Sequence, residues 1–401
     1  MNDAATAKLG AAAPDTAAWL ARVAIAGPAV EAAAPDADRV RWLTDGAMAA
    51  LHEQRLFRLL LPRALGGEEV TLPVFFAVIE ALAYYDGSAA WCVCQGNGCA
   101  MLGAYLAPKV GAAIWAEDAA GVLAWGPGKA EARAVEGGYH VTARSVFVSG
   151  CHHATWLAAH CTVLEPDGTP RLDADGVAEN RTCLFPATAT SLTENWDAIG
   201  LRGTGSDAFA IDGLFVPDDH TIVRATMIER ASNRSALYEF PQMSIYASGF
   251  AATALGIARG FIDAFLDLAQ EKRPRLVTSP IKDNPVVQDE VARAEARWSA
   301  ARAFLVAEVD RGWREAETTG AISVAQRMRI RLAATHAIHE SKAAVDTLFD
   351  TAGTSAVFAS GPFERRLRDI HTVALQIQGR KTHFQTYGAW RLGHPADMTV
   401  I

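Results

Sequence analysis

The chain has 401 residues, 50% of them hydrophobic, and a formal net charge of −8 at pH 7. This acidic balance argues against a nucleic-acid partner, because binding to phosphates needs a basic patch. We also predict no membrane partner, because we expect no run of the about 18 or more uncharged residues that a membrane span needs. The opening segment lacks a cationic start followed by an apolar stretch, so we expect a cytoplasmic protein without a secretory signal.

Six cysteines lie at positions 92, 94, 99, 151, 161 and 183. The spacing of Cys92 and Cys94 does not suit a structural zinc site, and no second pair follows it. Beside Cys151, His152 and His153 have no further histidine or carboxylate at ligand spacing nearby. We therefore predict buried free thiols in a reducing compartment, and no metal site.

Residues 1–118 are predicted to form a helical domain. Apolar side chains recur there at three- to four-residue spacing, which is typical of helices; they are Leu56, Phe57, Leu60, Phe75, Val78, Ile79 and Leu82. Asp86 is the expected N-cap of a helix that runs through Trp91 and Met101.

Residues 119–230 show a β pattern. The stretch 139–143 alternates between apolar and polar side chains, as a half-buried strand does, and the pattern continues through 147–148 and 156–163. Residues 209–217 are predicted to form two short strands around a turn at Gly213. We therefore expect a compact β-domain between two helical regions.

Residues 231–401 are predicted to be helical again, with helices over 255–269, 287–305 and 324–351. The alternation in 287–305 is typical of a bundle core or of a helix pair between subunits. The three regions together predict an α+β fold: an N-terminal helical domain (1–118), a middle β-domain (119–230) and a C-terminal four-helix-type bundle (231–401).

The chain shows no nucleotide-binding loop of its own. Glycine pairs at 96/98, 126/128 and 203/205 lack the third glycine of a dinucleotide fingerprint, and no GxxxxGK[ST] loop is present. A redox enzyme of this kind would have to receive its electrons from another protein.

Four charged residues, Arg365, Arg366, Arg368 and Asp369, precede an almost uncharged segment that ends at Gln378. Unpaired charge beside a buried face is costly, so we interpret these residues as a network that fixes the C-terminal helices. No carboxylate follows Asp369 in this segment to act as a base.

Several stretches resemble the acyl-CoA dehydrogenase superfamily, which has the same domain order. They are GYHVTARSVFVSG (138–150), WDAIGLRGTGS (196–206) with LFVP (214–217), ALGIARG (254–260), and GTS (353–355) with ERRLRD (364–369). The resemblance covers about residue 85 to the end of the chain, in the family's order and spacing.

Two stretches, FVSGCHHATW (147–156) and RDIHT (368–372), are more similar to the flavin-dependent monooxygenase branch. This resemblance implies the oxygenase component of a two-component system, which receives reduced FMN or FAD from a separate NAD(P)H–flavin reductase. It implies that O₂ is used to oxygenate an aromatic or hydrophobic small molecule. It also implies a homotetramer, with flavin near a subunit boundary.

By the same resemblance, the cofactor-binding candidates are Trp125, Phe147, Val148, Ser149, Arg273, Gly353 and Ser355. Ser149 matches the hydroxyl residue that contacts flavin N5, and Phe147 matches the aromatic residue that flanks the ring. Arg273 falls near an arginine that reaches the flavin phosphate of a neighbouring subunit, with Lys272 and Arg275 as alternatives. Purely structural roles stay open: a strand-end serine, a cation at a helix end and a buried loop tryptophan.

Trp91, Gln95 and His152 are the candidates for the substrate pocket. Trp91 and Gln95 lie one helical turn apart, and a role in the helix core is the alternative for Trp91. Two further functions stay open: a flavin-bound dehydrogenase or oxidase that inserts no oxygen, and a scaffold without flavin.

The sequence departs from both branches at the position of the usual catalytic group. The common base of acyl-CoA dehydrogenases falls at Ile377, whose alkyl side chain cannot accept a proton. The histidine common among the monooxygenases falls at Gln376, whose amide hydrogen-bonds but does not move protons near neutral pH. The catalytic candidates are therefore Ser149, Gln376 and His371, with His152 as another substitute for the missing histidine.

Overall fold

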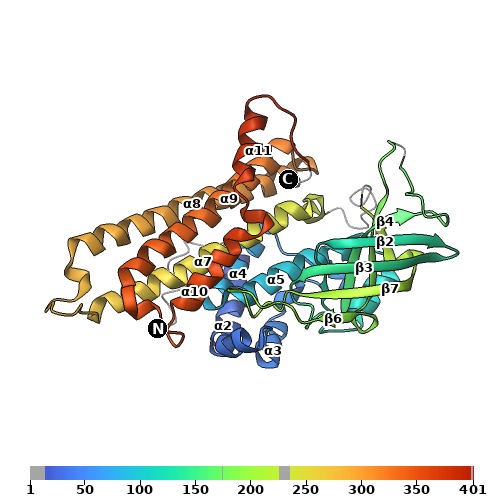
Figure 1. Ribbon diagram of the computed structural model, residues 1–401. Coiled ribbons are helices and arrows are strands. Elements are labelled where there is room, and N and C mark those ends of the chain that lie inside the picture. Colours follow the sequence, from blue (N-terminus) through green and yellow to red (C-terminus); the bar gives the residue numbers. More distant parts are fainter. Residues whose placement is uncertain (1–13, 174, 225–234, 399–400) are drawn as a thin grey trace.

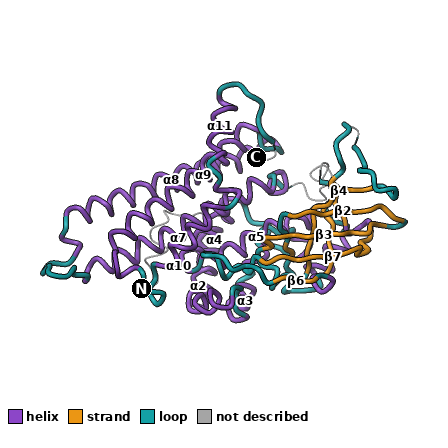
Figure 2. The backbone as a smooth tube through the Cα atoms, in the orientation of Figure 1, coloured by secondary structure: helices purple, strands orange, loops and turns teal. Residues whose placement is uncertain are grey.

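The computed structural model describes residues 14–173, 175–224, 235–398 and 401. A mixed β-sheet lies at one end of a long helical body (Figure 1, Figure 2). Helices precede and follow the strands along the chain, as the predicted α+β fold requires. The start of the opening segment (1–13) and the predicted domain boundary at 230–231 lie outside the described residues.

The helices before the sheet are α2 (Pro14–Val40), α3 (Asp45–Glu53), α4 (Leu72–Tyr85), α5 (Gly87–Ala100) and α6 (Pro108–Gly111). The predicted cap of α5 is confirmed, because Asp86 Oδ1 accepts the N–H of Ala89 at 2.8 Å. α5 is buried along its whole length and packs against α4 and the later helix α7 (Gln242–Glu271). Side chains on α5 therefore lie deep inside the molecule.

The strands are β1 (Leu123–Ala124), β2 (Gly128–Val135), β3 (Gly138–Val148), β4 (Trp156–Leu164), β5 (Asn180–Pro186), β6 (Ser191–Thr193), β7 (Asp207–Pro217) and β8 (Thr221–Val223). Their order in the sheet is β6-β7-β3-β2-β4-β5-β8, with β1 paired to β4. β1 and β2 run parallel to β4, and the other pairs are antiparallel. In β3, Val141 and Ala143 are buried while Thr142 is exposed, which confirms the predicted alternation.

The prediction of two short strands around Gly213 was wrong, because residues 207–217 form one continuous strand, β7. Gly213 has a φ of 64° and lies where the register of β7 against β3 shifts between Val141 and Ala143. Glycine adopts this conformation without the strain that a Cβ would cause. Gly213 therefore bends the strand instead of ending it.

The C-terminal helices are α7, α8 (Pro285–Thr319), α9 (Val324–Ala352), α10 (Glu364–Leu375) and α11 (Thr382–Arg391). α7, α8 and α9 lie side by side and extend away from the sheet (Figure 1). Leu82 of α4, Val93 of α5 and Leu255 of α7 belong to one buried apolar cluster. The helices from both ends of the chain thus share a core, whereas the sheet has a second cluster of its own.

Two helices, α2 and α7, are long and apolar enough to cross a membrane by length and composition alone. Residues 240–258 carry no charged side chain, so the prediction that no such run exists was wrong. The apolar window of α7 is 83% buried inside the protein. Its central place in the bundle therefore explains its composition, because a core helix must be apolar on most sides.

The charged residues of α10 join the three regions of the chain, in line with the structural role predicted for them. Arg368 pairs with Asp38 of α2 at 3.1 Å, and Arg366 donates to a backbone carbonyl at the end of α4. Asp369 Oδ1 accepts the N–H of Leu201, in the loop before β7, at 2.6 Å. α10 thereby anchors a loop that leads to the candidate active site.

Candidate active site

The hydroxyl of Ser149, just after β3, is the centre of a buried set of hydrogen bonds. The indole N–H of Trp91 in α5 donates to Ser149 Oγ at 3.0 Å. Ser149 Oγ also lies 2.7 Å from Ser206 Oγ, which lies 2.7 Å from Thr204 Oγ1. Thr204 in turn donates to the carbonyl of Leu201 at 2.8 Å. Ser149 is therefore held from two sides, by α5 and by the loop before β7.

Trp91 and Gln95 bring two further contacts to this region from α5. The ring of Trp91 stacks on Phe250 of α7 with 3.8 Å between centroids, which also fits the helix-core alternative for Trp91. The amide of Gln95 donates to the backbone carbonyl of Trp125 at 3.2 Å. Trp91, Gln95, Trp125 and Ser149, all predicted from the sequence, are thus brought together by the fold.

Phe147 and Val148, at the end of β3, were both predicted to contact the cofactor. Phe147 has a φ of 54°, which is uncommon for a residue with a Cβ, and it is 61% exposed. Val148 is fully buried. Gly126 lets the loop after β1 lie against this strand, because a Cβ at Gly126 would be 2.2 Å from a carbonyl oxygen of β3. The strand end therefore presents an exposed aromatic ring two residues before the buried Ser149.

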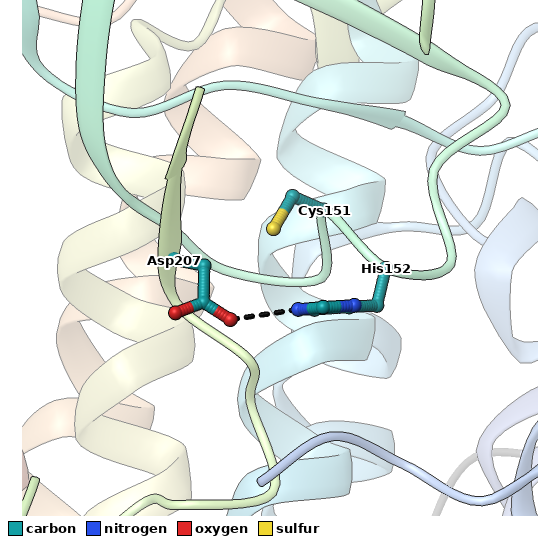
Figure 3. Close-up of side chains that lie close together, drawn as sticks. All are labelled: Cys151, His152 and Asp207. Atoms are coloured by element: carbon teal, nitrogen blue, oxygen red, sulfur yellow. Dashed lines mark hydrogen bonds and ion pairs between the residues drawn. The ribbon is translucent and has the colours of Figure 1, made fainter. Parts of the chain in front are cut away.

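His152, predicted to border the substrate pocket, is held by Asp207 at the start of β7, with 2.7 Å between Nε2 and Oδ2 (Figure 3). The other oxygen of Asp207 accepts two backbone N–H groups of the loop before β7, both at 2.6 Å. Cys151 lies beside this pair, and the three possible ligand atoms are within 4.8 Å of one another. Burial raises the pKa of the Cys151 thiol to about 12, and the thiol donates to a backbone carbonyl at 3.2 Å. Asp207 thus links the loop that follows Ser149, through His152, to the loop before β7.

His153 borders a small cavity that it shares with Ser149 and with apolar side chains, among them Phe57 and Val122. Its Nε2 atom is buried and has no hydrogen-bond partner among the described residues. Burial lowers the pKa of His153 to about 4, so its ring is neutral near pH 7. His153 was not among the predicted site residues, because only its burial in the folded chain distinguishes it from His152.

Gln376, Ile377 and His371 lie along and just beyond α10. Gln376 Oε1 accepts the N–H of Gln378 at 2.9 Å, whereas its Nε2 is buried without a partner in the described part of the chain. The side chain of Ile377 is 44% exposed. His371 Nε2 bonds to Asp346 of α9 at 2.7 Å. The catalytic roles of Gln376 and His371 stay predictions.

The other predicted cofactor residues gather around the end of α7. Lys272 donates to the last carbonyl of α9, directly before Gly353. Gly353 is exposed and has a φ of 53°, which favours glycine, and Ser355 follows it in a short 3₁₀ turn. Arg273 folds back and donates to a carbonyl of its own loop at 3.0 Å. Of the three cations left open by the sequence, Lys272 is the one bonded next to Gly353 within the described residues.

These two groups of residues lie at opposite ends of α7. Phe250 contacts Trp91 near one end, whereas Lys272 directly follows Glu271, the last helical residue. At about 1.5 Å per residue, the helix from residue 250 to residue 271 is about 30 Å long. Figure 1 shows the connection from α7 to α8 at the end of the bundle away from the sheet. One chain therefore leaves the residues around Gly353 remote from those around Ser149.

Residues 248–378 match the family model for the acyl-CoA dehydrogenase C-terminal domain. The chain is 26% identical to indole-3-acetate monooxygenase of Pseudomonas putida, over 89% of both proteins. It is also 26% identical to the flavin-dependent monooxygenase oxygenase subunit HsaA of Rhodococcus jostii, over 93% of this chain and 98% of that one. XiaF from Streptomyces sp., solved with FADH2 and glycerol, has a TM-score of 0.88 at 20% identity, covering 96% of this chain and 97% of XiaF.

The fold and the matching C-terminal domain define the class of protein: the chain has the fold of the acyl-CoA dehydrogenase superfamily, and residues 248–378 match its C-terminal domain. The relatives that cover most of its length are monooxygenases, among them the flavin-dependent oxygenase subunit HsaA. Within the superfamily, the protein is therefore similar to the flavin-dependent monooxygenase branch, whose members are oxidoreductases. The fold class and the branch predicted from the sequence are both confirmed.

The residues around Ser149 suit the flavin that this branch implies. The flavin ring system has two apolar faces and an edge of hydrogen-bonding atoms. Phe147 offers an exposed apolar ring, and the Ser149 hydroxyl, already bonded on two sides, retains one lone pair for a further donor. The described residues at this end therefore fit the ring of the cofactor.

Four members of the site were not predicted from the sequence: Ser206, Thr204, Asp207 and Phe250. Ser206 and Thr204 stand in the GLRGTGS stretch and served only as a family mark, and Asp207 directly follows that stretch. Phe250 lies in an almost uncharged stretch of α7 and looks like any core residue. The motif could have pointed to the two hydroxyls, whereas nothing local points to Phe250.

Proposed function

We propose that this protein is the oxygenase component of a two-component system. A separate NAD(P)H–flavin reductase would deliver reduced FAD or FMN, and one oxygen atom of O₂ would be inserted into an aromatic small molecule. The observation that carries the proposal is the buried hydroxyl of Ser149, held by Trp91 and Ser206 just beyond the strand end that carries the exposed ring of Phe147. When bound, reduced flavin supplies the electrons that activate O₂.

In this proposal the chain positions the reactants and keeps water away from them. Ser149 would hold an edge of the flavin through a hydrogen bond, and Trp91 and Ser206 hold its hydroxyl in place. The stacked rings of Trp91 and Phe250 form a flat apolar wall that suits an aromatic substrate. Because these side chains are buried, they exclude water from the reacting atoms.

We further infer that the substrate ring is reactive without a strong base from the protein. The position of the usual histidine holds Gln376, whose amide orients a hydroxyl but does not take its proton near neutral pH. Buried His153 is neutral near pH 7 because its pKa is lowered to about 4. Electron-rich aromatic rings, such as phenols and indoles, are therefore the first substrates to test.

The test is a single-turnover reaction with labelled oxygen. The protein is mixed without air with reduced FAD or FMN and a panel of phenols and indoles, then with ¹⁸O₂, and the products are analysed by mass spectrometry. We expect product with one ¹⁸O atom, formed only when reduced flavin and folded protein are both present. Product formed without O₂ by a protein that retains oxidised flavin would instead support the dehydrogenase or oxidase alternative.

We propose a homotetramer in which a second copy completes each flavin site. The separation of about 30 Å along α7 supports this, because one chain cannot present both groups of residues to one flavin ring and its phosphate. Exposed apolar side chains near these ends also support a contact: Val357, Phe358, Leu375 and Ile377. Light scattering should give four times the chain mass of 42.8 kDa. A monomer with full flavin affinity would contradict the proposal.

We also propose a cytoplasmic location. All six cysteines are buried and free, as the sequence predicted, and free thiols are typical of reducing compartments. Fractionation of cells that produce the protein should recover it with cytoplasmic markers.

A further inference from the structure

The hydroxyl chain that runs from Ser149 to the carbonyl of Leu201 has only one arrangement of protons. Two oxygen atoms 2.7–2.8 Å apart need a proton between them. The chain has three such contacts, and Ser149, Ser206 and Thr204 supply three hydroxyl protons. A carbonyl has no proton to give, so Thr204 must donate to Leu201.

Each of the other protons is then committed in the same direction. Since the hydroxyl of Thr204 donates its proton to the carbonyl, Thr204 can only accept a hydrogen bond from Ser206. Since the hydroxyl of Ser206 donates to Thr204, Ser206 can only accept a hydrogen bond from Ser149. The proton of Ser149 is therefore used, and its oxygen also accepts the indole N–H of Trp91, which is a donor only. One lone pair of Ser149 stays available.

The carbonyl that sets this direction is fixed in place. Trp196 Nε1 donates to the carbonyl of Leu201 at 2.9 Å, and the N–H of Leu201 donates to Asp369 Oδ1 at 2.6 Å. Thr204 and Ser206 are 1% and 5% exposed. Because bulk water does not reach them, it cannot offer alternative partners that would reverse the chain.

We propose that Ser206 and Thr204 are positioning residues that make Ser149 a hydrogen-bond acceptor toward the flavin. This inference rests on the proposed function. N5 of reduced flavin carries a proton and donates, whereas N5 of oxidised flavin has only a lone pair. An acceptor at Ser149 matches the reduced cofactor and sets lone pair against lone pair with the oxidised one. The chain of hydroxyls thus selects the form that a reductase delivers and favours release of the spent form.

The test compares the dissociation constants of oxidised and reduced FAD, with the midpoint potential of the bound flavin as a second readout. In Ser206→Ala, Ser149 loses its acceptor and can turn its proton toward N5. We expect this variant to bind oxidised FAD about tenfold more tightly, with reduced FAD little changed. The midpoint potential should then fall by about 30 mV, which is a tenfold change for a two-electron couple. Thr204→Val should shift both readouts in the same direction, because Ser206 loses its acceptor.

Two control variants separate proton direction from packing. Thr204→Ser keeps the hydroxyl and the direction of the hydrogen-bond chain. It should therefore keep the wild-type ratio of the dissociation constants for oxidised and reduced FAD, and the wild-type potential. Ser341→Ala removes a buried hydroxyl of α9 that has no partner among the described residues, and it should change neither readout. Thermal melts identify the variants that fold.

The outcomes distinguish this inference from the proposed function. If the wild type binds flavin but both Ser206→Ala and Thr204→Val keep its ratio, the inference is wrong and the proposed function stands. An equal shift in Thr204→Ser and Thr204→Val would show that packing sets the ratio, which also overturns the inference. If the wild type binds neither form of flavin, both proposals fail. Should one of the two test variants not fold, the other decides.

Discussion

The two ends of α7 differ in how much of the site one chain provides. At the end next to the sheet, Trp91, Phe250 and Ser149 are buried and held by contacts with one another or with the β-domain. At the far end, Gly353 is exposed and Lys272 is only half-buried. A buried hydroxyl has a fixed direction, whereas a cation near water acts mainly through its charge and is screened by salt. The core of one chain therefore fixes the direction of the hydrogen bonds around Ser149, whereas the cation Lys272 at the far end stays accessible to another surface.

The largest expected difference between the two ends is in stability. Phe250→Ala empties the wall that stacks on Trp91 and should lower the free energy of unfolding by about 3–5 kcal/mol. Leu276→Ala, in the loop after α7 at the far end, removes a side chain that is 97% exposed and should change the free energy of unfolding by less than about 0.5 kcal/mol. Urea unfolding of both variants measures the contrast. Similar losses would show that the far end is as well packed as the near end.

The near end should also respond to pH, through the anchor at Asp369. Burial first, and then the neighbouring Asp86 carboxylate, raise the pKa of Asp369 to about 7, although Arg365 and Arg368 oppose the shift. An aspartate in the unfolded chain ionises near ~3.9, so the folded protein binds more protons between about pH 4 and pH 7. The stability from this group is therefore fully present below about pH 4 and is lost as the pH rises through about 7.

Asp369→Asn tests this dependence, because asparagine still accepts the N–H of Leu201 but does not ionise. One pKa unit corresponds to about 1.4 kcal/mol. From about pH 5 to about pH 8, we expect the free energy of unfolding of the wild type to fall by at least ~1 kcal/mol relative to the variant. Urea unfolding at each pH gives the two curves. If the free energies of unfolding of the wild type and the variant change with pH in parallel, protonation of Asp369 does not contribute to stability.

A smaller expected effect concerns the chemistry at the near end. Ser149→Ala removes the oxygen atom that would accept a hydrogen bond from the flavin. The loss of one such bond corresponds to about a tenfold change in the ratio of oxygenated product to hydrogen peroxide. We expect the ratio of oxygenated product to hydrogen peroxide to fall by about that factor. The free energy of unfolding should also fall by about 1–3 kcal/mol, because the buried indole N–H of Trp91 loses its acceptor. Ser341→Ala serves as the matched control and should keep the wild-type ratio. A product ratio unaffected by Ser149→Ala would remove Ser149 from the catalytic candidates.

The smallest expected effect concerns the far end. Lys272→Met should weaken flavin binding by about threefold at low salt and by less at high salt, because salt screens a cation that is only half-buried. Arg273→Met should have a smaller effect, since the guanidinium of Arg273 is bonded within its own loop. Flavin titration at two salt concentrations measures both. A larger loss in Arg273→Met would favour Arg273 as the phosphate ligand, as the resemblance first suggested.

Motifs near β3 made part of the site predictable, because their residues are close in the chain. Phe147, Val148 and Ser149 are consecutive, and their motif identified the strand end correctly. The role of Gly213 was predicted wrongly because a glycine with positive φ can form the turn between two strands or can bend one continuous strand. The choice depends on the partner strand, here β3, and not on local sequence.

The helix–sheet–helix order, the resemblance to the superfamily and the residues of the strand end could all be predicted from the sequence. They could be predicted because apolar periodicity and helix capping depend on nearby residues, and because each motif is a continuous stretch of the chain. The folded structure was needed to show that Trp91, Ser149, Ser206 and Thr204 form one directed hydrogen-bond chain. It was also needed to show that the residues around Gly353 lie at the other end of α7. The directions of hydrogen bonds and distances between remote segments arise only when helices and sheet pack together, so no stretch of the sequence carries them alone.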